Sequence, residues 1–251
     1  MYSEVQAMNM LVRKECTMSM ENSETRRFAM HDHPRILVNN DFGSIHVKGG
    51  DQSTEVTVQV TQRNWILLGE TAAPAQIHYE QNNDDNSVTI SVERSGSGLS
   101  VTEIILNITV PWYADLNLAT KAGSIDATTV TGQMLLHTNA GSIAVRQSTL
   151  GGSSIVQTNA GSVSFDGAID PQGVYQFVTN TGSVHVVLPS HTAFHVDART
   201  DIGSITTNVP GVQVTRLNYM NSEAHGDIGN LPRGSITLRS NLGSIYLQQT
   251  F

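Results

Sequence analysis

The chain is poor in cysteine and in aromatic residues. Among its 251 residues there is one cysteine, Cys16, so an intrachain disulfide is excluded and cysteine usage gives no sign of an oxidising compartment. Aromatic residues make up 6% of the chain and hydrophobic residues 39%, a lean supply for the core of a large globular domain. We therefore expect an elongated molecule.

Basic residues are also few. The chain has 14 Lys and Arg against 22 Asp and Glu, a formal net charge of -8, and the basic residues do not cluster. This balance argues against nucleic acid or another polyanion as a partner. No stretch approaches the ~20 apolar residues of a membrane span, and residues 1–20 lack the apolar core of ~7–15 residues found in a secretory signal. We expect a soluble, unexported, cytoplasmic chain without a membrane span.

What the chain has in abundance is a tripeptide of Gly, Ser and a β-branched residue. Eight copies occur, far more than this composition gives by chance, which indicates an internal repeat. Successive copies from Gly123 to Gly203 lie 18 to 21 residues apart, and a gap of 40 residues follows before Gly243. We expect Gly226-Asp227-Ile228 to fill this gap, giving seven consecutive units from Gly123 onward. The eight copies begin at Gly43, Gly123, Gly141, Gly161, Gly182, Gly203, Gly234 and Gly243.

Each unit is predicted to be a strand, a turn and a second strand. Apolar residues on both sides of each glycine alternate with the period of two that indicates half-buried strands. The predicted turn has the sequence Thr-Asn-Ala-Gly at 138–141 and 158–161. These residues suit a tight turn, because Asn tolerates left-handed backbone geometry and Gly has no Cβ. Stacked units would place equivalent side chains ~4.8 Å apart. This predicts an amide ladder at Asn139, Asn159, Asn180 and Asn241, and a hydroxyl ladder at Thr138, Thr158, Thr179 and Thr200.

A single unit of about twenty residues cannot bury enough apolar surface to offset its backbone entropy, so the units must stack. The sequence therefore predicts an all-β fold, with a β-solenoid of about 20-residue units over residues 112–251. Residues 26–111 carry longer hairpins, and we expect them to continue into the solenoid as an N-terminal β-section that caps its open end. Residues 1–25 are expected to be an N-terminal extension, either disordered or with weak helical spacing.

A bulky apolar run, Trp65, Ile66, Leu67 and Leu68, interrupts the strand pattern inside a loop. Two interpretations stay open. The run folds back on the cap or over outward-facing residues of the solenoid, or it stays exposed and contacts a partner, because four large apolar side chains on one loop form a binding patch. These four residues are the candidate partner contact that the sequence suggests.

Residues that carry chemistry are scattered. His31, Asp32 and His33 place two imidazoles close together, half of a zinc or nickel site, but no further ligands follow at a recognisable spacing. Phosphate-binding loops, nucleophile elbows and zinc-protease motifs are missing from the sequence. Outward residues of neighbouring units do not converge, and Arg146 with Asp166 is expected to form an exposed ion pair. We predict no catalytic residue, no metal ligand, no cofactor and no enzyme activity.

Four motifs follow one another along the chain: Ile-Leu-Val-Asn-Asn-Asp-Phe-Gly-Ser-Ile at 36–45, Val-Thr-Val-Gln-Val at 56–60, Ile-Thr-Val-Pro at 108–111, and then the repeated Thr-Asn-Ala-Gly-Ser-Ile turns. In this order they resemble the bacterial putative adhesin family, a group of uncharacterised toast-rack β-solenoid domains, over roughly residues 27–251. The resemblance implies a right-handed β-solenoid without known catalytic residues. It also implies association with the bacterial envelope or surface, as adhesin-like modules or as sensory domains.

These observations favour a non-enzymatic, adhesin-like structural or interaction module whose stacked surface binds a protein or glycan partner. The first alternative is a regulatory sensor domain of an envelope-stress signalling system. The second is a polysaccharide-active enzyme built on a β-helix.

Overall fold

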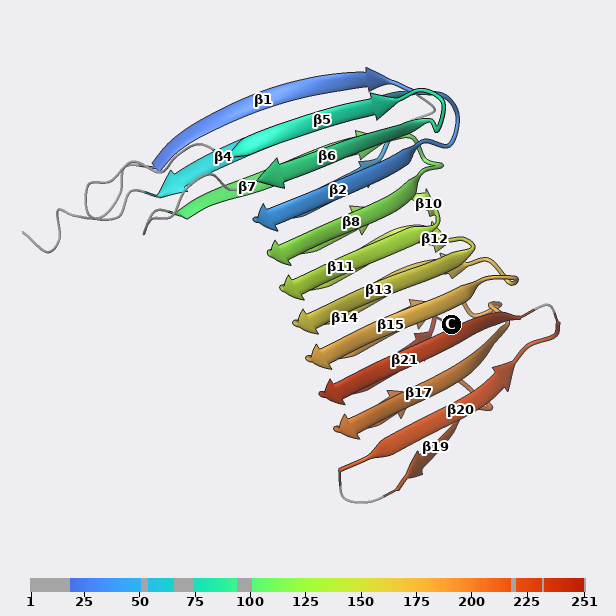
Figure 1. Cartoon of the computed structure of the whole chain (residues 1–251). Helices are drawn as coiled ribbons and strands as arrows, with labels where there is room; N and C mark the ends of the chain where they lie inside the picture. Colours follow the sequence, from blue (N-terminus) through green and yellow to red (C-terminus); the bar gives the residue numbers. More distant parts are fainter. Residues whose placement is uncertain are drawn as a thin grey trace, which may run out of the picture.

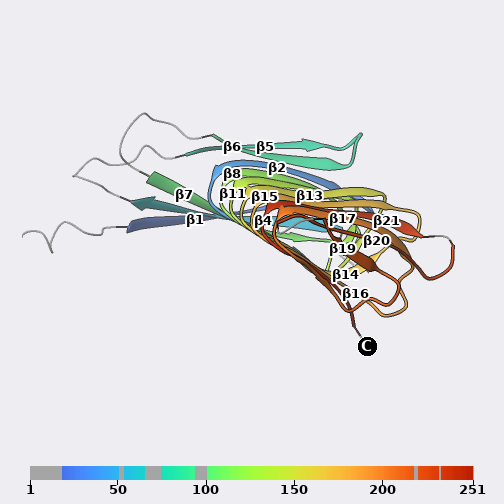
Figure 2. The ribbon, with the colours of Figure 1, turned by 90° about the horizontal axis from the view of Figure 1, so that it is seen from below.

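The computed structural model describes residues 19–50, 54–65, 75–93, 101–217, 220–231 and 233–250. These residues contain no helix, and hence none long and apolar enough to cross a membrane, and they form two open, eleven-stranded sheets packed face to face (Figures 1 and 2). The all-β prediction is confirmed. The first sheet holds β1 (Ser19–Ala29), β3 (Ile45–Gly49), β4 (Glu55–Trp65), β7 (Val101–Val110), β9 (Ile125–Thr128), β10 (Thr131–Gly132), β12 (Ile143–Leu150), β14 (Val163–Ile169), β16 (Val184–Leu188), β18 (Ile205–Thr207) and β22 (Ile245–Gln249). The second holds β2 (Arg35–Phe42), β5 (Gln76–Asn82), β6 (Ser87–Glu93), β8 (Asp115–Ala122), β11 (Met134–Ala140), β13 (Ser153–Ala160), β15 (Val174–Thr181), β17 (Phe194–Ile202), β19 (Gln213–Arg216), β20 (Ser222–Ile228) and β21 (Gly234–Leu242).

Each repeat unit contributes one strand to each sheet. The strand before a glycine turn lies in the second sheet and the strand after it lies in the first, as for β11 and β12 on either side of Gly141. Neighbouring units pair in parallel and in register, so that Leu118, Leu136 and Val156 lie side by side. Figure 1 shows the units one below another. The units are the strand pairs β2/β3, β8/β9, β11/β12, β13/β14, β15/β16, β21/β22 and β17/β18, in their spatial order.

The last unit along the chain is not the last in space. Strand β21 pairs with β15 on one side and with β17 on the other (Figure 1). In the first sheet β22 likewise lies between β16 and β18. The prediction that Gly226-Asp227-Ile228 forms a turn between units is wrong, because this tripeptide lies in β20, which runs antiparallel to β17 with Ile228 opposite Phe194. The gap in the repeat therefore holds the β19–β20 hairpin instead of a unit.

The glycine turns repeat because the units approach each other too closely for a side chain. Gly141 has φ of +148°, and a Cβ at this position would lie 2.1 Å from the carbonyl oxygen of Gly123 in the neighbouring unit. Gly123 in turn lies against Gly43 in the same way, with 2.1 Å between the added Cβ and the carbonyl oxygen. Glycine is therefore required by both backbone conformation and space.

The amide ladder predicted at the turns is present. Nδ2 of Asn159 donates to Oδ1 of Asn139 at 3.1 Å, Asn180 donates to Asn159 at 3.2 Å, and Asn241 donates to Asn180 at 3.3 Å. The ladder runs along the exposed edge of the stack and joins units through side chains as well as through backbone.

The threonine row differs from the hydroxyl ladder that was expected. Each buried hydroxyl donates to the glycine carbonyl of a neighbouring unit and not to the next threonine, as Thr138 does to Gly123 at 3.0 Å and Thr158 to Gly141 at 2.8 Å. The glycine carbonyl at the turn is the closer acceptor, so the row satisfies backbone groups that would otherwise be buried without a partner.

The core between the sheets is aliphatic, with large aromatic side chains at its centre. Phe165 and Phe177 are fully buried, and their ring centroids lie 5.3 Å apart. Tyr175 is buried beside them, with its hydroxyl 3.0 Å from the carbonyl oxygen of Leu150 and 2.8 Å from that of Asp170. With Phe194, these are the aromatic side chains among the largest fully buried side chains of the described residues.

Further strands extend the stack at both ends. At one end β7 and β6 continue the parallel pairing from β3 and β2, and the antiparallel strands β4, β1 and β5 follow them. At the other end the antiparallel strands β20 and β19 follow β17. Across the first end, Phe28 of β1 lies 6.1 Å from the ring of Tyr79 in β5, and the guanidinium of Arg26 lies 4.3 Å from that ring. Strand β1 begins inside the segment for which the sequence suggested an extension, while residues 1–18 lie outside the described residues.

The outer face of the first sheet carries a short ion-pair chain. Nη1 of Arg146 lies 3.0 Å from Oδ1 of Asp126, whose Oδ2 lies 3.3 Å from Nδ1 of His46. The expected pair of Arg146 with Asp166 is replaced by this one, although the two residues lie opposite each other in register. The long Arg146 side chain reaches diagonally to the preceding unit, where Asp126 already faces His46.

Candidate binding cleft

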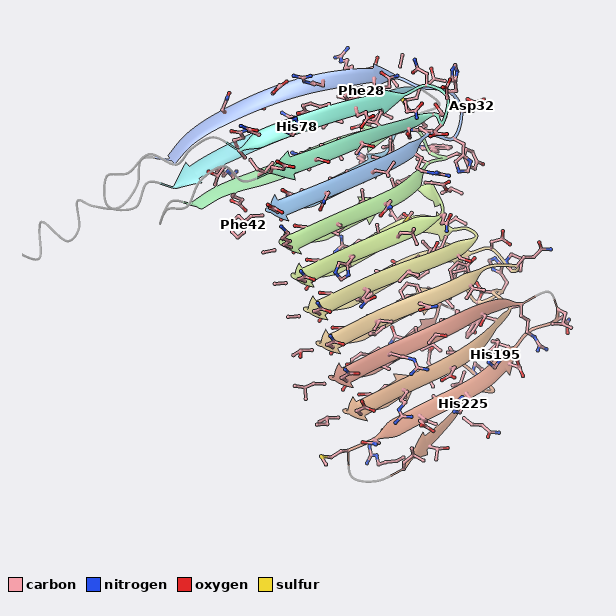
Figure 3. All side chains as sticks on the ribbon, in the orientation of Figure 1. Phe28, Asp32, Phe42, His78, His195 and His225 are labelled. Carbon is pink, nitrogen blue, oxygen red and sulfur yellow. The ribbon has the colours of Figure 1, made fainter. Side chains whose placement is uncertain are left out.

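Three connections between strands meet at one end of the sheets. They are residues 30–34 between β1 and β2, residue 54 at the start of β4, and residues 111–114 between β7 and β8. Backbone hydrogen bonds join them: the amide of Met30 donates to the carbonyl of Thr54 at 2.7 Å, and that of Asp115 donates to Pro34 at 3.0 Å. In Figure 3, Asp32 marks this end of the molecule.

The three connections enclose an open cleft of about 520 Å³. Sites for small ligands usually measure ~300–1,000 Å³, so the cleft has the size of a ligand site. Its wall combines aromatic rings, imidazoles, one carboxylate and one hydroxyl. The lining residues are His31, Asp32, His33, Thr54, Pro111, Trp112 and Tyr113.

Two aromatic side chains at the cleft are exposed, Trp112 at 47% and Tyr113 at 62%. Their backbone is fixed by the neighbouring unit, because the amide of Thr131 donates to the carbonyl of Trp112 at 2.6 Å and Tyr113 forms a parallel bridge with Thr131. Pro111 ends β7, since proline has no amide hydrogen with which to continue the strand pairing. Exposed aromatic rings on a fixed backbone are typical of binding sites.

The wall formed by His31 and Asp32 is held by the side chain of Asn86, the last residue of the β5–β6 turn. Its Oδ1 accepts from the amide of His31 at 2.8 Å, and its Nδ2 donates to the carbonyl oxygens of His31 and Asp32 at 3.3 and 3.1 Å. His33 has a left-handed backbone, with φ of +61°. Such a conformation costs roughly 1–3 kcal/mol outside glycine, so it persists only where the surrounding contacts hold it.

His33 connects this wall to the stack. Its Nε2 lies 3.1 Å from Oδ1 of Asp115, and the same oxygen accepts a hydrogen bond from the amide of Gln133 at 2.8 Å. The carboxylate of Asp115 thus ties the loop to two neighbouring units. This arrangement, together with the contacts of Thr131, fixes the loop and the backbone of the two aromatic residues.

The metal half-site considered at His31 and His33 gains no partners in the structure. Among the described residues there is no group of three or more His, Cys, Asp or Glu side chains placed to hold a metal ion. The two histidines line the cleft instead.

The predicted partner contact lies elsewhere. Trp65 is the last residue of β4, where its backbone pairs with Ser19 of β1 and Val101 of β7, while Ile66, Leu67 and Leu68 lie outside the described residues. Thr54 and Trp65 stand at opposite ends of β4, so this contact and the cleft are separated by the length of the strand. The contact stays a prediction.

Sequence reasoning missed Trp112 and Tyr113. The available signal was two adjacent aromatic residues directly after a proline-terminated strand, in a chain with 6% aromatic residues. Their neighbours His31, Asp32, His33 and Thr54 come from positions 58 to 82 residues away in the sequence, and only the fold brings them together.

Comparison with known proteins shows that the fold of this chain is similar to that of a solved structure. The sequence matches no family model and no curated protein. Among solved structures, the chain is similar to a putative cell adhesion protein from Clostridium sporogenes, with 12% identity and a TM-score of 0.52 over 92% of this chain and 100% of that one. A putative adhesin from Parabacteroides distasonis aligns with 12% identity and a TM-score of 0.36 over 91% and 97% of the two chains. The resemblance to putative adhesins expected from the sequence is thus confirmed at the level of fold, on the Clostridium structure.

Proposed function

We propose that the chain is a non-enzymatic, adhesin-like interaction module that presents a stacked β-solenoid surface to a protein or glycan partner. The observation that carries the proposal is the pair of exposed rings, Trp112 and Tyr113, held on a fixed backbone at a cleft. Large apolar groups left exposed on a rigid surface favour association with a partner. The name of the Clostridium sporogenes protein, a putative cell adhesion protein, agrees with this function.

The side chains of the cleft support binding over catalysis. Among its described lining residues Asp32 is the one carboxylate, whereas glycoside hydrolysis commonly needs two carboxylates ~5–9.5 Å apart. His33, one of the two imidazoles adjacent to Asp32 in sequence, lies against Asp115, which itself accepts a hydrogen bond from the backbone amide of Gln133. These contacts give His33 and Asp115 the role of holding the loop in place.

In this proposal residues 112–251 form a right-handed solenoid of about 20-residue units, and residues 26–111 form a hairpin-rich section that caps it. The in-register pairing of β8, β11 and β13 supports the coil. The contact of Phe28 and Arg26 with Tyr79 supports the cap, since these side chains cover the end of the core. Trp65 to Leu68 form a second contact surface in the same proposal.

The test is a binding experiment on the purified full chain. Labelled protein is incubated with bacterial and host cells, and then with panels of surface proteins and of glycans, with an acidic β-rich protein of similar size as the control. Saturable binding to one of these surfaces is expected. Binding no stronger than that of the control would contradict an adhesin-like role, and turnover of a polysaccharide would contradict a non-enzymatic one.

A further inference from the structure

We infer that the cleft of Trp112 and Tyr113 binds a neutral oligosaccharide. This inference rests on the proposed function and narrows it to one ligand class and one site. The argument uses the chemistry of the wall, its rigidity and its charge.

The wall combines the two kinds of contact that a sugar needs. A pyranose ring has apolar C–H faces and a rim of hydroxyl groups, so it pairs an aromatic ring on its face with hydrogen-bonding groups at its edge. Trp112 and Tyr113 supply rings of which about half the surface is free. The carboxylate of Asp32, the imidazole of His31 and the hydroxyl of Thr54 supply donors and acceptors in the same cleft. A purely apolar ligand such as an acyl chain would leave these polar groups without partners.

The charge of the cleft disfavours acidic ligands. The described lining residues include one carboxylate and no Lys or Arg. A sulfated, phosphorylated or sialylated glycan would meet the Asp32 carboxylate without a guanidinium or ammonium group to offset it. The net charge of -8 on the whole chain adds to this repulsion. A neutral saccharide fits, since Asp32 can accept hydrogen bonds from adjacent hydroxyl groups.

The walls are fixed before binding, which lowers the entropy cost of complex formation. Asn86 holds the loop of His31 and Asp32 through three hydrogen bonds, and Thr131 holds the backbone of Trp112 and Tyr113. The volume of about 520 Å³ and the open mouth leave room for more than one sugar unit.

The full chain is screened on an array of neutral and acidic glycans, and affinity for the best neutral oligosaccharide is measured by calorimetry. Emission of Trp112 is followed in a Trp65→Phe variant, which leaves Trp112 as the single tryptophan, after calorimetry has compared the affinity of that variant with that of the unchanged chain. Tyr113→Ala and Asp32→Asn are each expected to weaken binding about tenfold or more, as residues central to a binding site do. Tyr246→Ala is the matched control, because Tyr246 is a partly exposed aromatic that stacks on His185 at 4.4 Å on another face. It should leave affinity unchanged.

Trp112→Ala, followed by calorimetry alone, gives a second test, and circular dichroism checks that each variant folds. Three results would overturn the inference: no neutral glycan binds, acidic glycans bind more tightly, or affinity is unchanged in both Tyr113→Ala and Trp112→Ala. If the chain binds cells through a protein and not a glycan, the inference fails while the adhesin-like role stands. If it binds no cell, protein or glycan, both fail.

Discussion

The side-chain amide of Asn241 donates a hydrogen bond to Oδ1 of Asn180 at 3.3 Å, although 61 residues separate the two. The backbone repeats this contact, because the amide of Gly182 donates to the carbonyl of Leu242 at 2.9 Å. Together they place the last unit of the chain beside β15/β16, with β17/β18 displaced to the end of the stack. The C-terminal unit thus closes the core by insertion between two units made earlier in the chain.

Replacing Asn180 with alanine breaks the amide ladder in its middle. The variant loses a donor to Asn159 and an acceptor for Asn241. Since both bonds are exposed, each is worth about 0.5–1 kcal/mol, and we expect the free energy of unfolding in urea to fall by about 1–2 kcal/mol. Asn117→Ala, at an exposed position of β8 outside the ladder, is the control and should change stability by less than about 0.5 kcal/mol. Equal effects would mean that the ladder does not stabilise the stack.

Gly141→Ala tests the close approach of the turns. The new Cβ would lie 2.1 Å from the carbonyl oxygen of Gly123, and φ at Gly141 is +148°. Strain and overpacking together should lower the free energy of unfolding by about 2–5 kcal/mol. Gly151→Ala is the matched control, since there the nearest atom to the added Cβ lies at 3.6 Å, an ordinary contact. Chemical denaturation of both variants measures the difference, and a Gly141→Ala protein as stable as Gly151→Ala would refute the close approach.

Two tyrosines with buried hydroxyl groups make opposite predictions for removal of the hydroxyl. The Tyr175 hydroxyl lies between the carbonyl oxygens of Leu150 and Asp170, whereas the buried Tyr79 hydroxyl has no hydrogen-bond partner among the described residues. Tyr175→Phe should therefore cost about 1–3 kcal/mol of stability, and Tyr79→Phe should be neutral or stabilising. A loss in Tyr79→Phe as large as that in Tyr175→Phe would contradict the contacts.

The same two side chains predict a loss of stability in alkali. Burial is the main cause that raises the pKa of Tyr79 and of Tyr175 from 10.0 to about 12. Because the folded-state pKa is raised above the unfolded value, the folded chain holds both phenolic protons more tightly; these groups leave the stability unchanged with pH below about 10, and the stability falls as the pH rises toward 12. Absorbance titration should show that both hydroxyls ionise above pH 10. The variant with both Tyr79→Phe and Tyr175→Phe should lose less stability between pH 10 and pH 12 than the unchanged chain.

The exposed pair of His195 on β17 and Asp227 on β20 predicts a lowered pKa for the Asp227 carboxyl group. His195 and Asp227 lie opposite each other, with Nδ1 3.0 Å from Oδ1, and Figure 3 shows His195 and His225 at this end of the molecule. The hydrogen bond from His195, followed by the charge of Arg233, holds the pKa of Asp227 below its ordinary value of 3.8. The pair therefore stabilises the folded chain above pH 3.8, and this stabilisation is lost as the pH falls through the folded-state pKa of Asp227. In a carboxyl NMR titration His195→Ala should raise the pKa of Asp227, and His225→Ala should not.

Local features of the fold could be predicted from the sequence. The glycine turns, the flanking strands and the Asn139–Asn159 contact depend on residues within one unit and its neighbour, so a one-dimensional period reveals them. The spatial order of units could not be predicted, because the period is the same whichever neighbours a unit has. Gly226 fitted the pattern by composition alone, although it lies in an antiparallel strand.

The cleft was less accessible to prediction than the fold. His31 and His33 drew attention as metal ligands, since two imidazoles in sequence suggest coordination. Their actual neighbours, Trp112 and Tyr113, come from a connection about 80 residues further along the chain. The contact exists because β2 and β8 are adjacent in the second sheet, which brings the loops before them together.

Disulfide trapping tests the insertion of the last unit most directly. In a Cys16→Ser background, Gln176→Cys is combined with Thr237→Cys, which is its register partner in β21, or with Asp197→Cys in β17, which is the partner of Thr237 on the far side. Adjacent strands place Cα atoms within the ~4.4–6.8 Å that a disulfide spans, and strands two positions apart do not. Mild oxidation should crosslink Gln176→Cys with Thr237→Cys and leave the other pair reduced. Crosslinking of Gln176→Cys with Asp197→Cys instead would show that units stack in chain order and would contradict this architecture.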